Sequence, residues 1–600
     1  MSHPDGVDLA SLSVDELLTK RKGLRRKLAA RENLQPIRIA VLSGSTTNEV
    51  VDLLELRLLD AGFAPTFHQS EYGRFYVDAV HDADTLVQFD PHLVYVHTSV
   101  RNIQRFAPMG CSEIEFEEHV KAEISFFQEI WTSLEEKIGC LVIQNNFEFP
   151  PYAILGNLDA TIAGGHTRFV SALNLECAQR AASNSKLLVQ DIWSISARIG
   201  LDQWFDFERW FNYKINTSLE GSHAIAISLT AIIRAMYGKT RKVLVLDLDN
   251  TLWGGVIGDD GVEKIQIGRE TPVAEAYSAF QQYCLSLRNR GVLLAVCSKN
   301  NEEIAKLGFE HPDSILKLEH ISCFKANWEP KHENIALIAK ELNLGADSFV
   351  FVDDNPAERE IVRAQTDGIA VPEVGSDVAQ YAKILETGRY FEQISLSQED
   401  YERAALYDQN TRRTAFEGKF ADYGEYLDSL SMTAEIGRFQ PIYLERIAQL
   451  TNKTNQFNLT TRRYTLDEIE SILTDPDAIG IYGRLRDRFG DNGLISVVLG
   501  RRTNDILDIE LWLMSCRVLK RDMELAMLDT LVGYARGMGI AILHGHYRPT
   551  KKNAMVQDHY PKLGFEMVSQ NPDGSAIYSL EVKGFAPRNT HIKIMEPANE

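Results

Sequence analysis

The chain has 600 residues, of which 44% are hydrophobic and 24% are charged. This composition is typical of a soluble globular protein, and the length predicts about three or four domains. Acidic residues (84) outnumber basic residues (63), which gives a net charge of −21. We therefore expect neither nucleic acid nor an anionic membrane to be its main partner. Its first residues lack the pattern of a secretory signal, so we expect a cytoplasmic protein.

The seven cysteines are spread along the chain without a Cys-x-x-Cys pair, which argues against a disulfide framework and a thiolate zinc site. Near the N-terminus, residues 1–36 form a predicted helical segment that contains the basic run 20–27. That run is either a docking patch for an acidic partner or a solvated helix face that acts as a strut.

Apolar runs at 37–44, 92–98, 140–146 and 186–191 alternate with segments of helical periodicity. This alternation predicts a parallel sheet flanked by helices over 37–238. A second α/β set, over 239–390, has apolar runs beginning at Val243 and covering 291–298 and 348–354, with a helix over 272–290 that begins at Pro272.

The third region, 391–600, begins with a charged helical stretch at 397–428. Strand-like runs then precede one main helix at about 521–537, a pattern that indicates a mixed α+β domain. These runs lie at 478–485, 493–500, 506–515 and 541–547, the last after the helix. The predicted fold class is therefore α/β and multidomain.

Pairs of aspartates follow two of the apolar strands in the second domain. Asp247 and Asp249 follow the first, and Asp353 and Asp354 follow a later one. Open parallel sheets place ligands at the carboxyl ends of their strands, so these carboxylates are expected to converge there. Mg²⁺ is the cation such a group of oxygen ligands suits, often together with a phosphate.

The residues DLDNT, a strand-ending Ser298, Lys331 and VDD, in that order, resemble the four motifs of the haloacid dehalogenase (HAD) superfamily. The resemblance implies that Asp247 attacks phosphorus and that Asp249 protonates the leaving oxygen and later activates water. It also implies that Thr251 and Ser298 hold the phosphoryl oxygens and that Lys331 neutralises their charge. Asp353 and Asp354 would complete the Mg²⁺ site.

The short spacing between these motifs leaves no room for a large lid domain, which predicts a capless, open site. The segment from Thr251 to Gly268 is expected to form a small β-hairpin flap beside it. Trp253 in this segment either lines the entrance or packs the flap onto the core. Asn300, two residues after Ser298, is a further candidate for binding substrate.

Longer stretches resemble FkbH-type proteins of capless HAD class IIIC: DLDNTLWGGVIGDDG, AVCSKNN, FVDDNPAERE, LTNKTNQFNLTTRRY and SCRVLKRDME. The resemblance implies a glyceryl transferase/phosphatase of polyketide biosynthesis. Its substrate would be 1,3-bisphosphoglycerate, and the glyceryl group would end as a thioester on a phosphopantetheinylated acyl carrier protein. Two alternatives remain open, a plain HAD phosphatase and a non-catalytic scaffold that docks carrier proteins.

The end of the third domain, 553–568, resembles the closing motif of GNAT acyltransferases. Where that family has two glycines for coenzyme A, this chain has Lys520 and Asp522, so coenzyme A is not expected, whereas a pantetheine arm remains compatible. Cys516, beside Arg517 and other cations, is either a carrier of the glyceryl group or a buried strand-end residue.

The polar run from Asn452 to Asn458, which includes Asn455, is either a binding surface for glycerate or pantetheine or a solvated loop. The first domain resembles the SGNH-hydrolase fold, but Ser45 lacks the usual Gly-Asp-Ser context and position 194 holds no histidine. His223 is a candidate substitute for that histidine, but a scaffold or carrier-docking role is expected.

Overall fold

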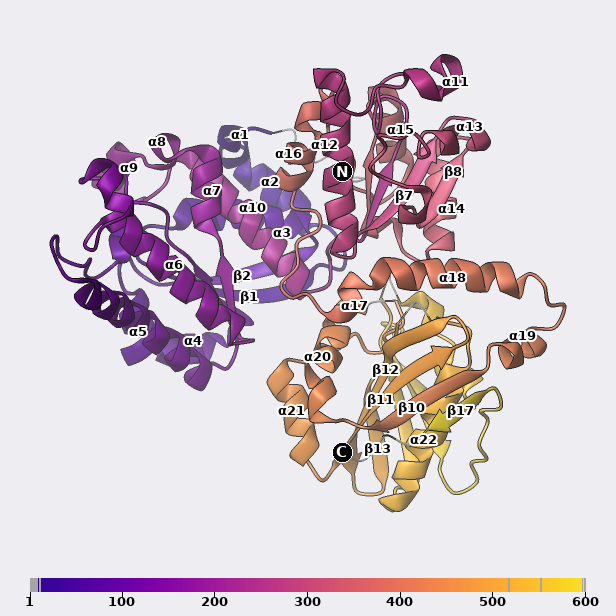
Figure 1. Cartoon of the computed structure of the whole chain (residues 1–600). Helices are drawn as coiled ribbons and strands as arrows, with labels where there is room; N and C mark the ends of the chain where they lie inside the picture. Colours follow the sequence, from indigo (N-terminus) through magenta and orange to yellow (C-terminus); the bar gives the residue numbers. More distant parts are fainter. Residues whose placement is uncertain are drawn as a thin grey trace. The chain divides into compact units, whose positions relative to one another are not determined.

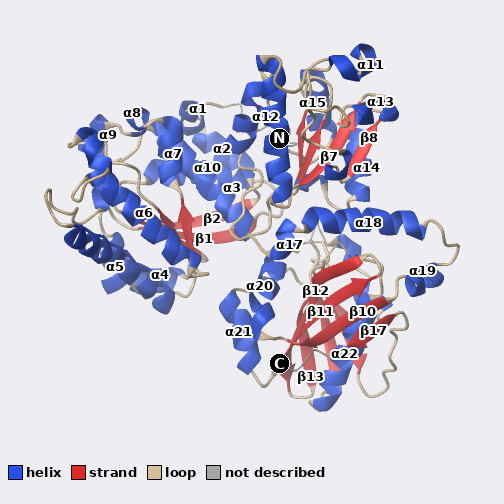
Figure 2. Ribbon diagram, viewed as in Figure 1, coloured by secondary structure: helices blue, strands red, loops and turns tan. Residues whose placement is uncertain are grey.

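The structure, a computed structural model, describes residue 9, residues 12–454, 456–515, 518–550 and 553–595, and residue 597, with the backbone alone for 398, 399, 404, 405, 408, 411, 414 and 415. The chain divides into two compact units, Met1–Arg234 and Ala235–Glu600 (Figure 1). Strands of both units alternate with helices, which confirms the predicted multidomain α/β class (Figure 2).

The first unit contains a parallel sheet with the strand order β2-β1-β3-β4-β5. Its strands are β1 (Gln35–Ser43), β2 (Phe63–Gln69), β3 (Leu93–His97), β4 (Leu141–Asn145) and β5 (Leu187–Gln190). Its helices are α1 (Val14–Thr19), α2 (Arg21–Ala29), α3 (Asn48–Asp60), α4 (Asp84–Phe89), α5 (Glu113–Lys137), α6 (His166–Ala182), α7 (Ile192–Ile199), α8 (Leu201–Trp204), α9 (Phe207–Tyr213) and α10 (Leu219–Met236).

The basic run near the N-terminus packs on its own unit. Arg21 forms an ion pair with Asp52 at 2.5 Å, and Arg25 forms one with Glu55 at 2.7 Å; both acids belong to α3. The strut interpretation therefore fits this run better than a free docking patch.

The second unit begins with a parallel sheet of order β8-β7-β6-β9. Its strands are β6 (Val243–Leu246), β7 (Leu293–Ser298), β8 (Cys323–Ala326) and β9 (Phe349–Val352). Its helices are α11 (Ile257–Asp260), α12 (Pro272–Asn289), α13 (Glu302–Leu307), α14 (Lys331–Glu341), α15 (Pro356–Gln365) and α16 (Tyr381–Thr387). Pro272 occupies the first turn of α12 as predicted, after the N-cap Thr271.

The β6 strand is buried on both faces. Leu244 and Leu246 pack into one apolar cluster, whereas Val243 and Val245 pack into another on the opposite face. A strand covered on both sides must be apolar at every position, which explains the uninterrupted run Val-Leu-Val-Leu before the aspartates.

The rest of the second unit is built on a mixed sheet of order β15-β16-β14-β13-β12-β11-β10-β17. Its strands are β10 (Met432–Arg438), β11 (Ala478–Asp487), β12 (Gly490–Thr503), β13 (Ile506–Met514), β14 (Ile542–Tyr547), β15 (Glu566–Gln570), β16 (Ala576–Glu581) and β17 (Ile592–Met595). Its helices are α17 (Gln398–Tyr401), α18 (Arg403–Glu417), α19 (Tyr423–Ser429), α20 (Leu444–Lys453), α21 (Leu466–Thr474), α22 (Met523–Gly537) and α23 (His559–Lys562). The predicted α+β character of this region is confirmed.

Several strands were absent from the prediction, among them β2, β8, β10 and β15 to β17. Two of them show why: β2 is an edge strand that contains Pro65 and stays partly exposed, and β8 is an edge strand of four residues. Short edge strands carry weak apolar patterns.

The predicted hairpin flap is also corrected. Gly254 and Gln266 form a single antiparallel bridge, and α11 lies between them. Among the described helices, none has the length and apolar character needed to cross a membrane.

Candidate active site

Three carboxylates meet at the carboxyl edge of the β6–β9 sheet. One oxygen each from Asp247, Asp353 and Asp354 lies within 4.8 Å of the others, and the first two residues are buried. Asp247 follows β6 and donates its backbone N–H to Val352 of β9 at 3.0 Å, so the parallel pairing of these strands brings the two loops together. Oxygen-only ligands in this number suit Mg²⁺.

Lys331 is the first residue of α14. Among the described residues, it is the one lysine that forms ion pairs with this carboxylate group. Its Nζ donates to Asp353 at 2.5 Å and lies 3.0 Å from Asp247. Burial alone would lower the pKa of Lys331, but the charges of these two aspartates outweigh it, and the pKa is raised above its usual range. The lysine is therefore charged, and the carboxylate group keeps a net negative charge that a divalent cation would neutralise.

Asp249 does not join the three carboxylates that lie together. Its Oδ1 accepts hydrogen bonds from Trp253 Nε1 at 2.9 Å and Ile257 N at 3.0 Å, and its Oδ2 accepts one from Asn300 at 3.0 Å. Its role as a metal ligand stays a prediction, since Asp249 stands outside the group of three carboxylates and both of its oxygens accept hydrogen bonds. Burial raises the pKa of Asp249, which favours a carboxyl group that can give up a proton.

Two predicted substrate-binding residues serve Asp249 instead. Trp253 is fully buried and packs edge-on against Phe309, so it does not line an entrance, and the packing interpretation holds. Asn300 is 4% exposed, and its amide is committed to Asp249. Both residues position the carboxyl group of Asp249.

Thr251 follows β6 and Ser298 ends the neighbouring strand β7, so both lie at the carboxyl edge of this sheet. Thr251 is fully buried, and its hydroxyl accepts a hydrogen bond from the backbone N–H of Asp354 at 3.2 Å, which ties the loops after β6 and β9 together. Ser298 is the last residue of β7 and is 2% exposed. Its neighbour Cys297 belongs to the apolar cluster on one face of the sheet, as its alternate position in the strand predicts.

Arg359 is a site residue that sequence reasoning missed. It is buried on α15, and one guanidinium nitrogen donates to the backbone carbonyls of Asp353 and Asp354 at 2.8 Å each. Its other nitrogens donate to Glu373. The signal was present in FVDDNPAERE, where an arginine follows the aspartate pair by one and a half helical turns.

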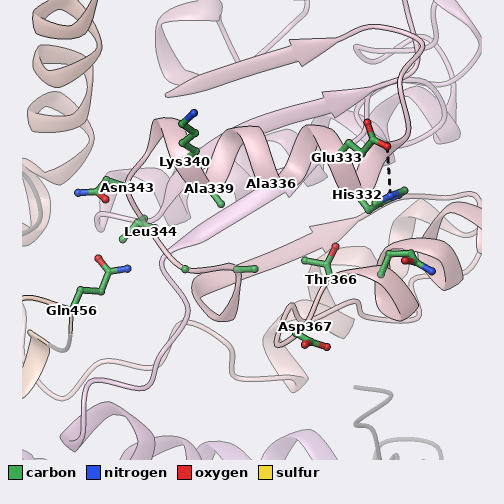
Figure 3. A pocket seen from close by; sticks show the side chains of 13 residues that line it. His332, Glu333, Ala336, Ala339, Lys340, Asn343, Leu344, Thr366, Asp367 and Gln456 are labelled. Carbon is green, nitrogen blue, oxygen red and sulfur yellow. Dashed lines mark ion pairs between the residues drawn. The ribbon is translucent and has the colours of Figure 1, made fainter. Parts of the chain in front are cut away.

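No lid domain interrupts this site. The segments between β6 and β7 and between β7 and β8, all of which the structure describes, hold α11, α12, α13 and short 3₁₀ turns. A cavity of about 550 Å³ lies elsewhere, between α14 and the end of α15, and none of the four aspartates of the site (247, 249, 353 and 354) lines it. Figure 3 shows His332 and Glu333 at one end of that cavity and Gln456 at the other.

Three of the predicted site residues, Cys516, Arg517 and Asn455, lie outside the described residues. Of the cations that follow Cys516 in the sequence, Arg521 is 6% exposed and donates to Asp487 and Asn492. Lys520 and Asp522, which stand where acyltransferases have glycines, both have a left-handed backbone, with φ of 63° and 58°. The chain therefore keeps the backbone turn that glycines favour while carrying charged side chains.

In the first unit, His223, the candidate substitute for the missing histidine, is engaged by an arginine. The Ser43 hydroxyl donates to the carbonyl of Ser45, Asp191 caps the N-terminus of α7, and the His223 ring lies 2.7 Å from Arg57. The expected scaffold role of this unit remains a prediction.

The chain is similar to several solved structures. The chain is 31% identical to the N-terminal part of the protein BF1531 from Bacteroides fragilis, which contains a phosphatase domain and was crystallised in complex with Mg; the match covers 63% of this chain and 99% of that one, with a TM-score of 0.58. The ribosomal-protein-S18-alanine N-acetyltransferase of Escherichia coli covers 26% of this chain at 13% identity, with 99% of its own length matched and a TM-score of 0.21. No family model and no curated protein sequence match the chain.

Proposed function

The chain belongs to the same family as the phosphatase-domain protein BF1531 of Bacteroides fragilis, and from this premise we propose that it is a Mg²⁺-dependent HAD-type phosphatase. The observation that carries the proposal is the meeting of Asp247, Asp353 and Asp354 with the buried ammonium of Lys331. These residues would hold Mg²⁺, which when bound would screen the charge of a phosphoryl group.

The residues of this chain account for two chemical steps. In the first, a carboxylate oxygen of Asp247 forms a bond to phosphorus while the bond from phosphorus to the leaving oxygen breaks, and Asp249 gives that oxygen its proton. In the second, water attacks phosphorus, Asp249 takes a proton from the water, and the bond between Asp247 and phosphorus breaks to release phosphate. Ser298 and Lys331 would hold the phosphoryl oxygens throughout.

Asp249 is built for proton transfer. Its three hydrogen-bond donors fix both carboxylate oxygens, and burial raises its pKa, so the neutral acid forms more readily than in water. Asp247, by contrast, has one oxygen 3.0 Å from the ammonium of Lys331.

We further propose the activity of the FkbH-type proteins that the chain resembles. The substrate would be 1,3-bisphosphoglycerate, and the glyceryl group would be loaded on a phosphopantetheinylated acyl carrier protein for polyketide biosynthesis. An acyl phosphate is activated enough to acylate a thiol, whereas the ester phosphate of the same molecule requires a phosphatase. The proposal is supported by the presence of a mixed α+β region after the parallel β6–β9 sheet in the same chain.

The test is to incubate the full chain with Mg²⁺, 1,3-bisphosphoglycerate and a pantetheinylated carrier protein, and to measure free phosphate and the intact mass of the carrier. The expected result is phosphate release together with a glyceryl increment on the carrier. Phosphate release without that increment would indicate a plain phosphatase. The absence of both products would favour a docking scaffold.

Asp247→Asn is expected to abolish phosphate release because it removes the nucleophile. Asp377→Asn, at an exposed acid that caps a 3₁₀ turn, is the matched control and should release phosphate at the wild-type rate. Equal activity in both variants would contradict the proposed chemistry.

A further inference from the structure

Arg101 in the first unit has a guanidinium group that is held on one side and unpaired on the other. It lies in the short 3₁₀ turn after β3, and its Nε donates to the side-chain oxygen of Asn216 at 3.1 Å. Its two terminal nitrogens form no hydrogen bond and no ion pair within the described part of the chain. The residue is partly exposed, and neither nitrogen is among the unpaired atoms that are buried from solvent. The free end of this side chain is therefore open to a ligand.

Two neighbours fix the direction of this guanidinium group. Asn216 is 3% exposed, and its amide nitrogen donates to the fully buried Glu148 at 2.7 Å, which keeps its oxygen toward Arg101. On one face, the guanidinium carbon lies 4.4 Å from the centroid of the Trp210 ring. Because the arginine is already held in place, it loses little conformational entropy when it binds an anion.

Aromatic rings extend from Arg101 to the surface of the unit. Phe205 lies 5.9 Å from the guanidinium carbon and stacks on Phe207, whose ring stacks in turn on Tyr152 with centroids 5.7 Å apart. Tyr152 and Phe207 are 64% and 37% exposed, and Phe211 of the same helix α9 is 69% exposed. Exposed apolar side chains that adjoin one another mark interaction sites, whereas single ones do not. We call Arg101, Tyr152, Phe207, Trp210 and Phe211 the aromatic surface.

The aromatic surface lies at the carboxyl edge of the first sheet. Arg101 comes after β3, and Tyr152 comes after β4. The end of α9 is joined to the loop after β1, because the backbone N–H of Thr46 donates to Lys214 O at 2.9 Å and its hydroxyl donates to Tyr213 O at 2.8 Å. Open parallel sheets bind ligands at this edge. The surface therefore occupies the ligand-binding edge of this unit.

The chemistry of this surface fits a ligand with one phosphate and an uncharged, flexible chain. A guanidinium group with two free nitrogens pairs with the two free oxygens of a phosphodiester, and aromatic faces pack against amide and methyl groups. Lys214, whose ammonium lies 5.4 Å from the Trp210 ring, adds a second positive charge. A nucleic acid would require a longer track of cations. The phosphopantetheine arm of a carrier protein combines a phosphodiester with a chain of amide and methyl groups.

The openness of the aromatic surface favours an arm carried on a protein over a free cofactor. Sites for small molecules are concave and bury most of the ligand, whereas Tyr152 and Phe211 are both more than half exposed. Further apolar side chains follow in the same loop as Tyr152, where Ile154 and Leu158 are 64% and 58% exposed. These residues give the body of a carrier protein an apolar area to contact.

We propose that the aromatic surface docks the phosphopantetheine arm of the acyl carrier protein, with Arg101 bonded to the phosphodiester and the rings of Tyr152 and Trp210 packed against the arm. This inference rests on the carrier loading proposed above. It gives the first unit a role in holding the carrier, separate from the phosphatase chemistry.

The test is calorimetric titration of the full chain with one carrier protein, prepared with its phosphopantetheine arm (holo) and without it (apo). The holo form should bind about tenfold more tightly than the apo form, the equivalent of one strong hydrogen bond. Arg101→Gln should weaken binding of the holo form about tenfold and leave that of the apo form unchanged. Tyr152→Ala, at a largely exposed position, should also weaken binding of the holo form and should not affect folding.

The matched control is Arg168→Gln in the same unit. The Arg168 guanidinium carbon also lies over a ring, 4.6 Å from the centroid of Phe116, but both terminal nitrogens donate to Glu113, at 2.9 and 2.6 Å. This variant should bind the holo carrier as the wild type does. In all three variants, phosphate release from an aryl phosphate should keep the wild-type rate, so failure of the docking site and failure of the phosphatase are distinguishable.

A second measurement needs no carrier protein. Ligand-observed NMR should show that the wild-type chain binds 4′-phosphopantetheine in preference to pantetheine, and that Arg101→Gln removes this preference. Because the comparison isolates the phosphate, it tests the site even where the loading reaction fails. Equal binding of the two compounds to the wild-type chain would contradict the role of Arg101.

Three further results would overturn the inference. Unchanged binding of the holo carrier by Arg101→Gln and Tyr152→Ala would show that the carrier docks elsewhere. Free coenzyme A that binds as tightly as the holo carrier would make the surface a cofactor site. A dimer of the chain that Tyr152→Ala dissociates would make a second copy of the chain the occupant.

Discussion

Lys331 and Asp353 are joined by a 2.5 Å hydrogen bond at a site where the lysine side chain is 4% exposed and the aspartate side chain is fully buried. A lysine in such a place is stable only because Asp247 supplies a second negative partner at 3.0 Å. Removal of the lysine would leave three carboxylates close together without a counter-charge. The same ion pairs therefore support both folding and catalysis.

Lys331→Met should stop phosphate release and destabilise the domain by about 3–5 kcal/mol, the cost of leaving buried charges unpaired. Mg²⁺ should restore part of that stability, because it supplies the missing positive charge. Thermal melting with and without Mg²⁺ checks this. Lys340→Met, on the exposed side of α14, is the control, and an equal loss in both variants would show that the buried pairs contribute nothing.

Asn300 should affect catalysis through Asp249. Asn300→Ala removes one of three donors to that carboxyl group, so protonation of the leaving oxygen should slow by about tenfold, the worth of one hydrogen bond. The loss should be large for an alkyl phosphate and small for an aryl phosphate, whose leaving group needs no proton. The control is Asn301→Ala, which removes the N-cap of α13. If Asn300→Ala lowers the rate equally for the alkyl and the aryl phosphate, Asn300 does not act through proton donation by Asp249.

A side chain at Gly308 should displace Trp253 and thereby disturb Asp249. A Cβ at Gly308 would lie 2.5 Å from the Trp253 ring, and Trp253 is fully buried and donates to Asp249. Gly308→Ala should destabilise the domain by about 1–3 kcal/mol through overpacking and should lower activity with the ring displaced. Gly533→Ala in α22, where a Cβ meets nothing within 4 Å, should be neutral or stabilise the protein.

The sequence predicted the catalytic edge because its signals are local. Uninterrupted apolar runs such as 243–246 indicate strands buried on both faces, and the parallel order of those strands brings Asp247 and Asp353 to one edge. That reasoning needs no side-chain direction, only the point at which each strand ends.

The sequence could not predict which way side chains turn after a strand ends. Asp249 lies only two residues from Asp247, but its carboxylate accepts hydrogen bonds from Trp253, Ile257 and Asn300. The positions of α11 and of the loop after β7 determine this orientation. Arg359 was missed for the same reason. It donates to two backbone carbonyls whose positions are set only when the loop after β9 folds. Long-range packing decides both positions.

The buried His97 and the half-buried His223 should make the first unit sensitive to mild acid. Burial lowers the pKa of His97 to about 4, and burial together with Arg57 lowers that of His223 to about 4. The unfolded chain takes up these protons near pH 6.5, so stability is complete above that pH and falls as the pH drops toward 4.

The expected slope in that window is about 1.4 kcal/mol per pH unit for each histidine. Hydrogen exchange of β3 and β4, corrected for its intrinsic pH dependence, measures it. His97→Gln should reduce the slope, and the added change His223→Gln should reduce it by about the same amount again. An unchanged slope would mean that other groups carry the acid sensitivity.

Asp487 should be essential to the C-terminal domain because it pairs two buried arginines. Arg413 donates two hydrogen bonds to it, at 2.7 and 2.9 Å, and Arg521 donates a third at 3.1 Å; both arginines are less than 8% exposed. Burial and the neighbouring Arg413 lower the pKa of Arg521 to about 10, which still leaves it charged at neutral pH.

Asp487→Asn leaves two buried guanidinium groups without a counter-charge, so the free energy of unfolding should fall by about 3–5 kcal/mol. Arg413→Met in that background should recover part of the loss, because one unpaired charge is removed, and a double-mutant cycle measured by urea unfolding gives the coupling. Asp475→Asn breaks a more exposed pair with Arg501 and should cost less than about 1 kcal/mol. If it costs as much as Asp487→Asn, burial is not what makes the Asp487 pairs important.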